Sequence, residues 1–213
     1  MQRRISVVAG WLSDFLEDLT DQEWDSFKRA EYWAHGCVQQ RERQERVADL
    51  AAASMSGDLV EIGCYTGGMT VRLAKIARRY GRQVLAIDPW KVGTQDCQGG
   101  EYEEFLKNIE PYQDIVRVIR QSSQTKSAQK IMKRYDLCFA FVDGLHTYKA
   151  ALPDILSVAH AGVIAVDDIL WNAGVRSAFI DGAQRTDKVL AHMILWREGY
   201  LFSDDALGRC VSA

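Results

Sequence analysis

The chain has 213 residues, of which 47% are hydrophobic and 26% are charged, a composition typical of a globular protein with a full core. Its 26 Lys and Arg residues face 29 Asp and Glu residues, which gives a formal net charge of −3. This balance argues against nucleic acid as a partner, because binding a phosphate backbone normally requires a basic excess. No apolar run approaches the roughly 20 residues of a transmembrane helix, so we expect no membrane insertion.

The five cysteines are odd in number, and no two of them have the spacing of a Cys-x-x-Cys pair. We interpret them as reduced thiols. At the N-terminus, acidic residues at Asp14, Glu17 and Asp18 interrupt the apolar residues before the core of a signal peptide develops. Together these features predict a cytoplasmic protein.

Residues 1–56 carry no strong strand signal, and apolar residues such as Trp11, Phe15 and Leu19 recur at helical spacing. The stretch RERQERVADLAAASMSG predicts a charged, alanine-rich helix that ends at Gly57. We therefore expect a helical N-terminal extension over 1–56, which would act as a lid or as a dimer contact. The main domain would cover 57–213.

From residue 57 onward, short apolar runs alternate with helical patterns. In chain order, the pairs are LVEIG with GGMTVRLAKIARRYG, QVLAID with a helix near 101–109, IVRVIRQ with SAQKIMKRY, LCFAFVD with a helix after His146, and GVIAVDD with a helix that includes TDKVLAHMILWREG. Near-continuous apolar strands separated by helices indicate a parallel sheet that is covered on both faces. The fold class predicted is therefore α/β, Rossmann-like and doubly wound, with a mostly parallel sheet.

Two further details of the sequence concern the helix after His146 and the C-terminal tail. Pro153 predicts a kink or a restart in the helix after His146. The tail LFSDDALGRCVSA has a polar turn between two strand-like pieces, which predicts an antiparallel hairpin that closes the sheet.

The first predicted strand runs into the glycine-bearing turn EIGCYTGGMT, residues 61–70. In open α/β sheets, ligands bind beyond the carboxyl ends of the strands, and glycines let a ligand approach the backbone closely. The glycines alone fit a plain strand-to-helix turn equally well. The second strand, however, ends at Asp88, where a carboxylate can accept hydrogen bonds from ribose hydroxyls. The loop and the acid together favour a nucleoside ligand.

Two features that are absent from the glycine loop narrow the choice of nucleoside ligand. Tyr65 occupies the position at which a dinucleotide-binding loop needs its second glycine, so NAD is disfavoured. The Lys-Ser/Thr ending of a phosphate-binding P-loop is also absent, which argues against ATP as a phosphoryl donor. S-adenosylmethionine, a nucleoside without phosphates, fits better.

Three acids follow the fourth and fifth predicted strands, namely Asp143 and the pair Asp167 and Asp168. If these strands are neighbours, the carboxylates converge, and an all-oxygen ligand set suits Mg²⁺ or Mn²⁺. His146, three residues after Asp143, is then suited to act as a general base. The alternatives are that the acids cap helices or are solvated, and that His146 is a structural hydrogen-bonding residue.

The segments GDLVEIGCYTGGMT, VLAIDPW, FVDGLHTY and GVIAVDDILW, within residues 57–171, resemble class I S-adenosylmethionine-dependent methyltransferases. The similar branch includes the macrocin O-methyltransferase-like and catechol O-methyltransferase-like enzymes. The resemblance implies a metal-dependent O-methyltransferase that acts on a small hydroxylated molecule such as a sugar, a polyol, a natural product or a catechol. It also implies a homodimer.

The resemblance also assigns site residues. It implies cofactor contacts for the glycine loop, Asp88 on the ribose, Trp90 and Ser122 beside the adenine, Mg²⁺ or Mn²⁺ on the three acids, and His146 as base. The cofactor-binding residues implied are Glu61, Gly63, Tyr65, Gly67, Thr70, Asp88, Trp90, Ser122 and Asp143; the metal ligands are Asp143, Asp167 and Asp168; the catalytic residues are His146 and Asp143. Met69 and the Gln121-Ser122 pair depart from the usual pattern of the family.

Two alternatives belong to other functional classes. One is a nucleoside-binding or scaffold protein that keeps this fold without catalysis, and the intact acids and His146 argue against it. The other is a nicotinamide-dependent oxidoreductase, which Tyr65 in the glycine loop disfavours.

Overall fold

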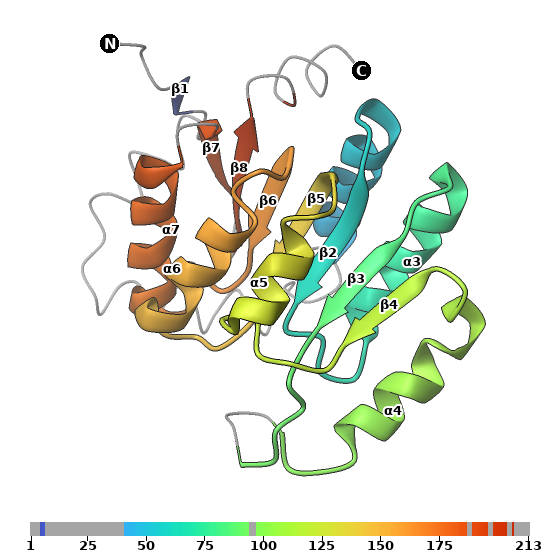
Figure 1. Cartoon of the computed structure of the whole chain (residues 1–213). Helices are drawn as coiled ribbons and strands as arrows, with labels where there is room; N and C mark the ends of the chain where they lie inside the picture. Colours follow the sequence, from blue (N-terminus) through green and yellow to red (C-terminus); the bar gives the residue numbers. More distant parts are fainter. Residues whose placement is uncertain are drawn as a thin grey trace.

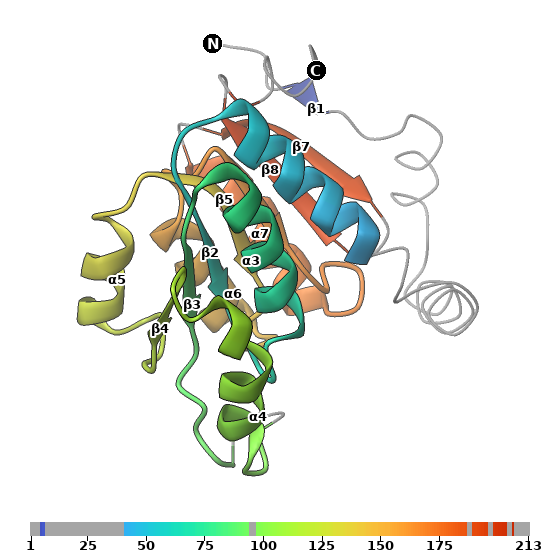
Figure 2. The ribbon, with the colours of Figure 1, turned by 90° about the vertical axis from the view of Figure 1, so that its right-hand side faces the viewer.

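The computed structural model describes residues 5–6, 41–93, 97–186, 189–195, 198–203 and 206. A central sheet carries helices on both of its faces (Figure 1, Figure 2). This arrangement confirms the predicted Rossmann-like, doubly wound α/β fold. None of the helices in the described ranges combines the length and the apolar character that a membrane crossing would require.

Within the described residues the sheet contains eight strands, and nearly all of them run in the same direction. They are β1 (Ile5–Ser6), β2 (Asp58–Ile62), β3 (Val84–Ile87), β4 (Val116–Ile119), β5 (Leu137–Val142), β6 (Val163–Val166), β7 (Val189–Leu195) and β8 (Glu198–Ser203). Their order is β1-β7-β8-β6-β5-β2-β3-β4, and only the pairings of β8 with β6 and β7 are antiparallel. The chain winds outward from β2 to β4 and returns to β5 beside β2. Ligand crevices of open sheets lie at such a switch point.

The helices pack in two layers. They are α3 (Gly68–Tyr80), α4 (Glu101–Asn108), the short η1 (Glu110–Tyr112), α5 (Lys126–Met132), α6 (Tyr148–Ser157) and α7 (Ala173–Arg185), with a further helix over 41–54. One core joins α5, α6 and α7 to the sheet, and the other joins the 41–54 helix, α3 and α4 to its opposite face. In β2, Val60 belongs to the core with α5, α6 and α7, and Leu59 belongs to the core on the opposite face. Successive strand residues point to opposite faces, so an uninterrupted apolar strand serves both cores.

The segment after β6 differs from the prediction. We expected a helix through TDKVLAHMILWREG, but the helix lies earlier, as α7, and this segment contains β7 and the start of β8. Asn172 caps α7, because its side-chain oxygen accepts hydrogen bonds from the backbone N–H groups of Gly174 and Val175. The run VLAHMIL contains good helix formers, yet its backbone pairs with β1 on one side and β8 on the other. Tertiary pairing thus outweighs helix propensity here. β7 and β8 form an antiparallel hairpin. Of the tail in which we expected a hairpin, only 201–203 and 206 are among the described residues, so that hairpin stays a prediction.

The structure also differs from the prediction at Pro153 and in the N-terminal stretch. Pro153 lies inside α6, which starts at Tyr148, so the helix does not restart at the proline. In the N-terminal stretch for which we expected no strand, Ile5–Ser6 pairs in parallel with β7. The remainder of 1–40 lies outside the described residues. The role of the 1–56 extension as a lid or dimer contact stays a prediction.

Candidate active site

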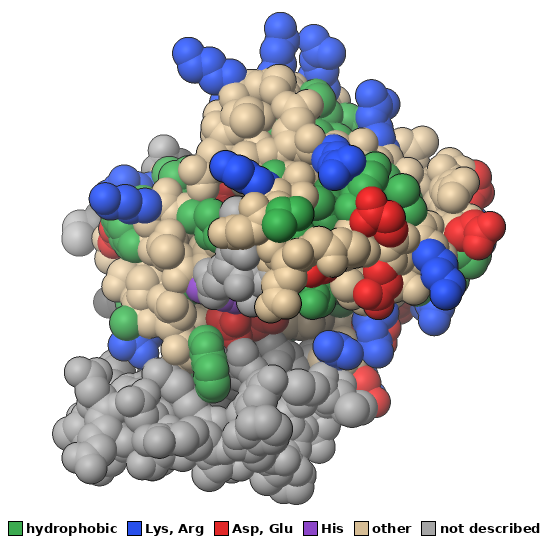
Figure 3. Space-filling view, turned by 90° about the horizontal axis from the view of Figure 1, so that it is seen from below, with side chains coloured by type: hydrophobic (Ala, Val, Ile, Leu, Met, Phe, Trp, Pro, Cys, Tyr) green, Lys and Arg blue, Asp and Glu red, His purple; other side chains and the backbone are tan. Residues whose placement is uncertain are grey.

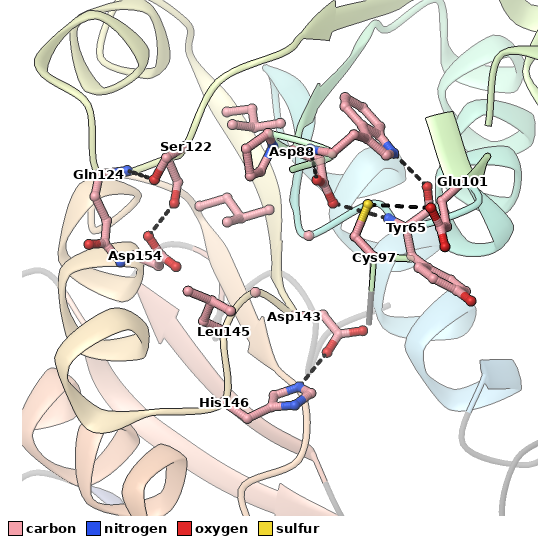
Figure 4. A pocket seen from close by; sticks show the side chains of 17 residues that line it. Tyr65, Asp88, Cys97, Glu101, Ser122, Gln124, Asp143, Leu145, His146 and Asp154 are labelled. Atoms are coloured by element: carbon pink, nitrogen blue, oxygen red, sulfur yellow. Dashed lines mark hydrogen bonds and ion pairs between the residues drawn. The ribbon is translucent and has the colours of Figure 1, made fainter. Parts of the chain in front are cut away.

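A cavity of about 420 Å³ opens at the carboxyl ends of the central parallel strands (Figure 4). Its wall comes from the loops after β2, β3, β4 and β5, with contributions from α4 and α6. Seven of the residues singled out in the sequence line this cavity: Gly63, Tyr65, Asp88, Trp90, Ser122, Asp143 and His146. A volume of this size is in the range of small-molecule binding sites.

The glycine loop after β2 is shaped by left-handed backbone conformations. Gly63 has a φ of 88°, and Gly67, which precedes α3, has a φ of 86°. A Cβ atom on residue 63 would lie 2.0 Å from the carbonyl oxygen of Asp143. Only glycine allows the loop to pass this close to the end of β5. Tyr65 also has a positive φ, 47°, and its side chain is exposed beside the cavity.

Asp88 holds the loop after β2 and the loop after β3 together. Its Oδ2 accepts hydrogen bonds from the backbone N–H groups of Cys64 at 2.8 Å and Tyr65 at 3.1 Å. Its Oδ1 accepts one from the backbone N–H of Trp90 at 2.7 Å. Each carboxylate oxygen has more than one lone-pair direction, so the carboxylate can still accept a ligand hydroxyl from the cavity. Its predicted contact with ribose stays a prediction.

Glu61 and Thr70 lie behind the loop and do not form part of the cavity wall. Both side chains are buried, and the Thr70 hydroxyl donates a hydrogen bond to the Glu61 carboxyl group. Burial raises the pKa of Glu61 well above its usual value. Gly67 is also outside the wall, and a Cβ atom there would press on the ring of Phe105 at 2.9 Å. These three residues support the loop from within, whatever contacts a ligand adds.

Trp90 connects the cavity to α4. Its ring is buried against Tyr102 and Phe105, with centroid distances of 4.9 and 4.6 Å. Its indole N–H donates a hydrogen bond of 2.7 Å to the backbone carbonyl of Tyr65. Trp90 thus fixes the two loops relative to each other, and α4 brings Glu101 to the cavity wall.

On the opposite side of the cavity, the loop after β4 meets α6. Sequence reasoning pointed to Ser122 there but missed Ser123, Gln124 and Asp154, which also line the cavity. The Ser123 hydroxyl donates a hydrogen bond of 2.6 Å to Asp154, which is buried on α6. No local pattern marks Asp154, because an acid within a helix is usually a solvated surface residue.

Asp143, His146 and Asp168 form a compact cluster at one end of the cavity. The Nε2 atom of His146 lies 3.3 Å from Oδ1 of Asp143 and 3.3 Å from Oδ2 of Asp168. One potential ligand atom from each of these residues lies within 4.8 Å of the others. The neighbouring strands β5 and β6 bring the two acids together, as the sequence predicted. The hydrogen bond to Asp143 and the negative charges of the acids raise the pKa of His146.

Asp167 lies next to this cluster rather than in it. Its Oδ1 accepts a hydrogen bond of 2.8 Å from the backbone N–H of Asp168. Burial raises the pKa of Asp167 well above its usual value, and the charges of Asp143 and Asp168 raise it further. Of the three predicted metal ligands, two therefore share the compact cluster with His146, and Asp167 lies beside it.

Solved structures similar to this chain include several O-methyltransferases. The O-methyltransferase NovP is 18% identical, with 78% of this chain and 80% of that chain covered and a TM-score of 0.57. CalS11, a TDP-rhamnose 3′-O-methyltransferase of calicheamicin biosynthesis, is 12% identical over 86% and 95%, with a TM-score of 0.59. An O-methyltransferase from Bacillus cereus, in complex with SAH, is 15% identical over 91% and 96%, with a TM-score of 0.56. These likenesses establish the fold.

The sequence comparisons give the family. No curated protein matches the chain. A family model described as a methyltransferase domain matches residues 60–169, which is more than half of the chain. The matched region contains the glycine loop, Asp88 and the cluster of Asp143, His146 and Asp168. The resemblance to S-adenosylmethionine-dependent methyltransferases is thereby confirmed, and the chain belongs to the methyltransferase domain family.

Proposed function

We propose that this protein is an S-adenosylmethionine-dependent O-methyltransferase that methylates a hydroxyl group of a small molecule, such as a sugar, a polyol or a catechol. The observation that carries the proposal is a nucleoside-sized cavity with His146 and two carboxylates at one end. The similar structures add support, since one is described as acting on TDP-rhamnose and another as binding SAH. The two alternatives from other functional classes gain no support from the family match.

The donor would bind along the glycine loop. Gly63 and Tyr65 would face its methionine and ribose parts, Asp88 its ribose hydroxyls, and Trp90 and Ser122 its adenine. All five residues line the cavity. On the face in Figure 3, Lys and Arg of the described residues lie mainly along the upper edge, and Asp and Glu lie mainly from the centre to the right. The formal net charge of −3 favours a small acceptor over a polyanion.

The acidic cluster fits a divalent cation. Two carboxylates and a ring nitrogen lie within 4.8 Å of one another, and a cation would relieve the mutual repulsion of the two carboxylates. Asp143 and Asp168 would hold Mg²⁺ or Mn²⁺, and Asp167 lies next to them, hydrogen-bonded to the backbone N–H of Asp168. Such an ion, when bound, favours loss of the proton from a neighbouring hydroxyl group.

His146 would act as the general base. Its Nε2 would take the proton of the acceptor hydroxyl, while the hydroxyl oxygen forms a bond to the methyl carbon and the methyl–sulfur bond breaks, leaving SAH. Asp143 and Asp168 hold the ring in place through contacts of 3.3 Å each. A positioned base of this kind contributes about 10²–10⁴-fold to the rate.

The first test is calorimetric titration with S-adenosylhomocysteine (SAH), with and without Mg²⁺. The proteins are wild type, Asp143→Ala and Asp114→Asn, a matched control in which an exposed carboxylate is removed. We expect Kd values of about micromolar for wild type and the control, with Mg²⁺ uptake lost only in Asp143→Ala. Absence of SAH binding by wild type under every condition would overturn the proposal.

The second test is an initial-rate assay of methyl transfer to a panel of sugars, polyols and catechols. His146→Gln should lower the rate about 10²–10⁴-fold while the Kd for SAH changes less than about threefold, because the base acts on the acceptor. EDTA should abolish the rate and Mg²⁺ should restore it. A rate that is unchanged in EDTA would overturn the proposed role of the metal ion. Asp143, His146 and Asp168 would then act in acid–base catalysis only.

A further inference from the structure

Asp154 is a buried carboxylate in the cavity wall that the proposed reaction does not use. Asp154 is only 2% exposed, yet it lines the cavity from α6. Its Oδ1 accepts the hydrogen bond from the Ser123 hydroxyl. Its Oδ2 receives no hydrogen bond from the part of the chain that the structure describes. One carboxylate oxygen is therefore available to a ligand.

Asp154 lies at one end of the cavity. Figure 4 shows Asp154 with Ser122 and Gln124 on the side opposite Tyr65 and Glu101. A Cβ atom on Gly144 would lie 3.1 Å from Oδ2 of Asp154, so the carboxylate packs closely against the loop after β5. Because residue 144 is a glycine and has no side chain, Oδ2 of Asp154 has room at this position.

The surroundings define what this end can bind. Apolar side chains of Ile87, Pro89 and Leu145 also line the cavity, and they suit the faces of a flat ring. Burial raises the pKa of Asp154 to about 6, so the group is mainly ionised above neutral pH. An ionised carboxylate only accepts hydrogen bonds. The edge of a ring that meets Asp154 must therefore carry a donor.

We propose that Asp154 accepts a hydrogen bond from the exocyclic amino group of the donor's adenine and makes the cavity selective for a 6-aminopurine over a 6-oxopurine. Three features lie side by side and carry this inference: a buried carboxylate oxygen, apolar cavity walls that fit a ring, and the Ser123 hydrogen bond that orients the carboxylate. It rests on the proposed function, since it assumes that the nucleoside of S-adenosylmethionine fills the cavity.

The experiment compares the Kd values of SAH and S-inosylhomocysteine. At position 6 of the purine an amino group is replaced by a carbonyl group, and N1 changes from an acceptor to an N–H donor. Wild type should bind SAH at least about tenfold more tightly, because a carbonyl oxygen would face the carboxylate. In Asp154→Asn, the new side-chain NH₂ group can donate to that carbonyl, so the ratio of the two Kd values should fall below about 2 or invert. Asp114→Asn, the same chemical change at an exposed site, should keep the wild-type ratio.

The ratio of the two Kd values distinguishes recognition of the purine by Asp154 from a purely structural role of Asp154. If Asp154 only braces Ser123, or contacts the amino-acid part common to both ligands, Asp154→Asn weakens both ligands equally and leaves the ratio unchanged. That result, with SAH still bound by wild type, would overturn the role of Asp154 alone. Failure of wild type to bind either ligand would overturn the proposed function and this inference with it. Circular dichroism during thermal unfolding checks that the variant is folded.

Discussion

Gly63 lies where the glycine loop passes the end of β5, and its replacement should disturb both stability and the active site. Its φ of 88° is unfavourable for residues with a Cβ atom, at a cost of about 1–2 kcal/mol. A Cβ atom would also lie 2.0 Å from the carbonyl oxygen of Asp143, whereas ordinary contacts begin at 3.4 Å. In Gly63→Ala, the loop and the end of β5 must therefore move apart by more than 1 Å.

This movement breaks hydrogen bonds at the carboxyl edge of the sheet. The N–H of Gly63 donates to Ile87 at 2.9 Å, and the N–H of Asp143 donates to Ile62 at 2.8 Å. Each such bond contributes about 1 kcal/mol, so the total loss should be about 3–4 kcal/mol. That is a large part of the 5–15 kcal/mol that typically separates folded from unfolded states.

Gly68→Ala is the matched control, because the same methyl group meets no atom within 4 Å there. As the first residue of α3, it should gain up to about 0.5–1 kcal/mol from the higher helix propensity of Ala. Urea unfolding at pH 7.5 gives both free energies of unfolding, and SAH titration reports the site. A free energy of unfolding for Gly63→Ala within about 1 kcal/mol of wild type would refute the reasoning.

Two further predictions concern buried carboxyl groups. Thr70→Val removes the hydroxyl that donates to Glu61 and should lower the free energy of unfolding by about 2 kcal/mol. Thr70→Ser keeps the hydroxyl and loses one buried methyl group, so it should lower the free energy of unfolding by only about 1 kcal/mol. Equal values for both variants in urea unfolding would contradict this prediction. The second prediction concerns Asp154, whose pKa is raised from 3.8 to about 6 by burial. The folded state binds this proton more tightly than the unfolded state, so the stability that protonation contributes is lost as pH rises from 3.8 to 6. Asp154→Asn lacks this loss, and its free energy of unfolding relative to wild type should rise by about 3 kcal/mol between pH 3.5 and pH 7. A constant difference across that range, measured by urea unfolding, would show that Asp154 titrates normally.

Much of the fold and part of the site could be predicted because their signals are local. Buried parallel strands require runs of apolar residues, and such runs mark β2 to β6 directly. The carboxyl ends of parallel strands meet at one edge, so residues that follow them, such as Asp88, Asp143 and Asp168, could be expected near one another before any contact was known.

Other features depended on contacts that no local pattern specifies. The run VLAHMIL suits a helix by propensity, and it is a strand because β8 offers it a hydrogen-bonding edge. Asp154 and Ser123 are 31 residues apart, and their hydrogen bond exists because α6 packs beside the loop after β4. The amino-acid sequence alone therefore determined the strands β2 to β6 and the edge of the sheet at which the candidate site lies, since periodicity and strand ends are properties of neighbouring residues. Only the tertiary structure decided which buried side chains meet in the cavity, because burial and pairing depend on how distant segments pack together.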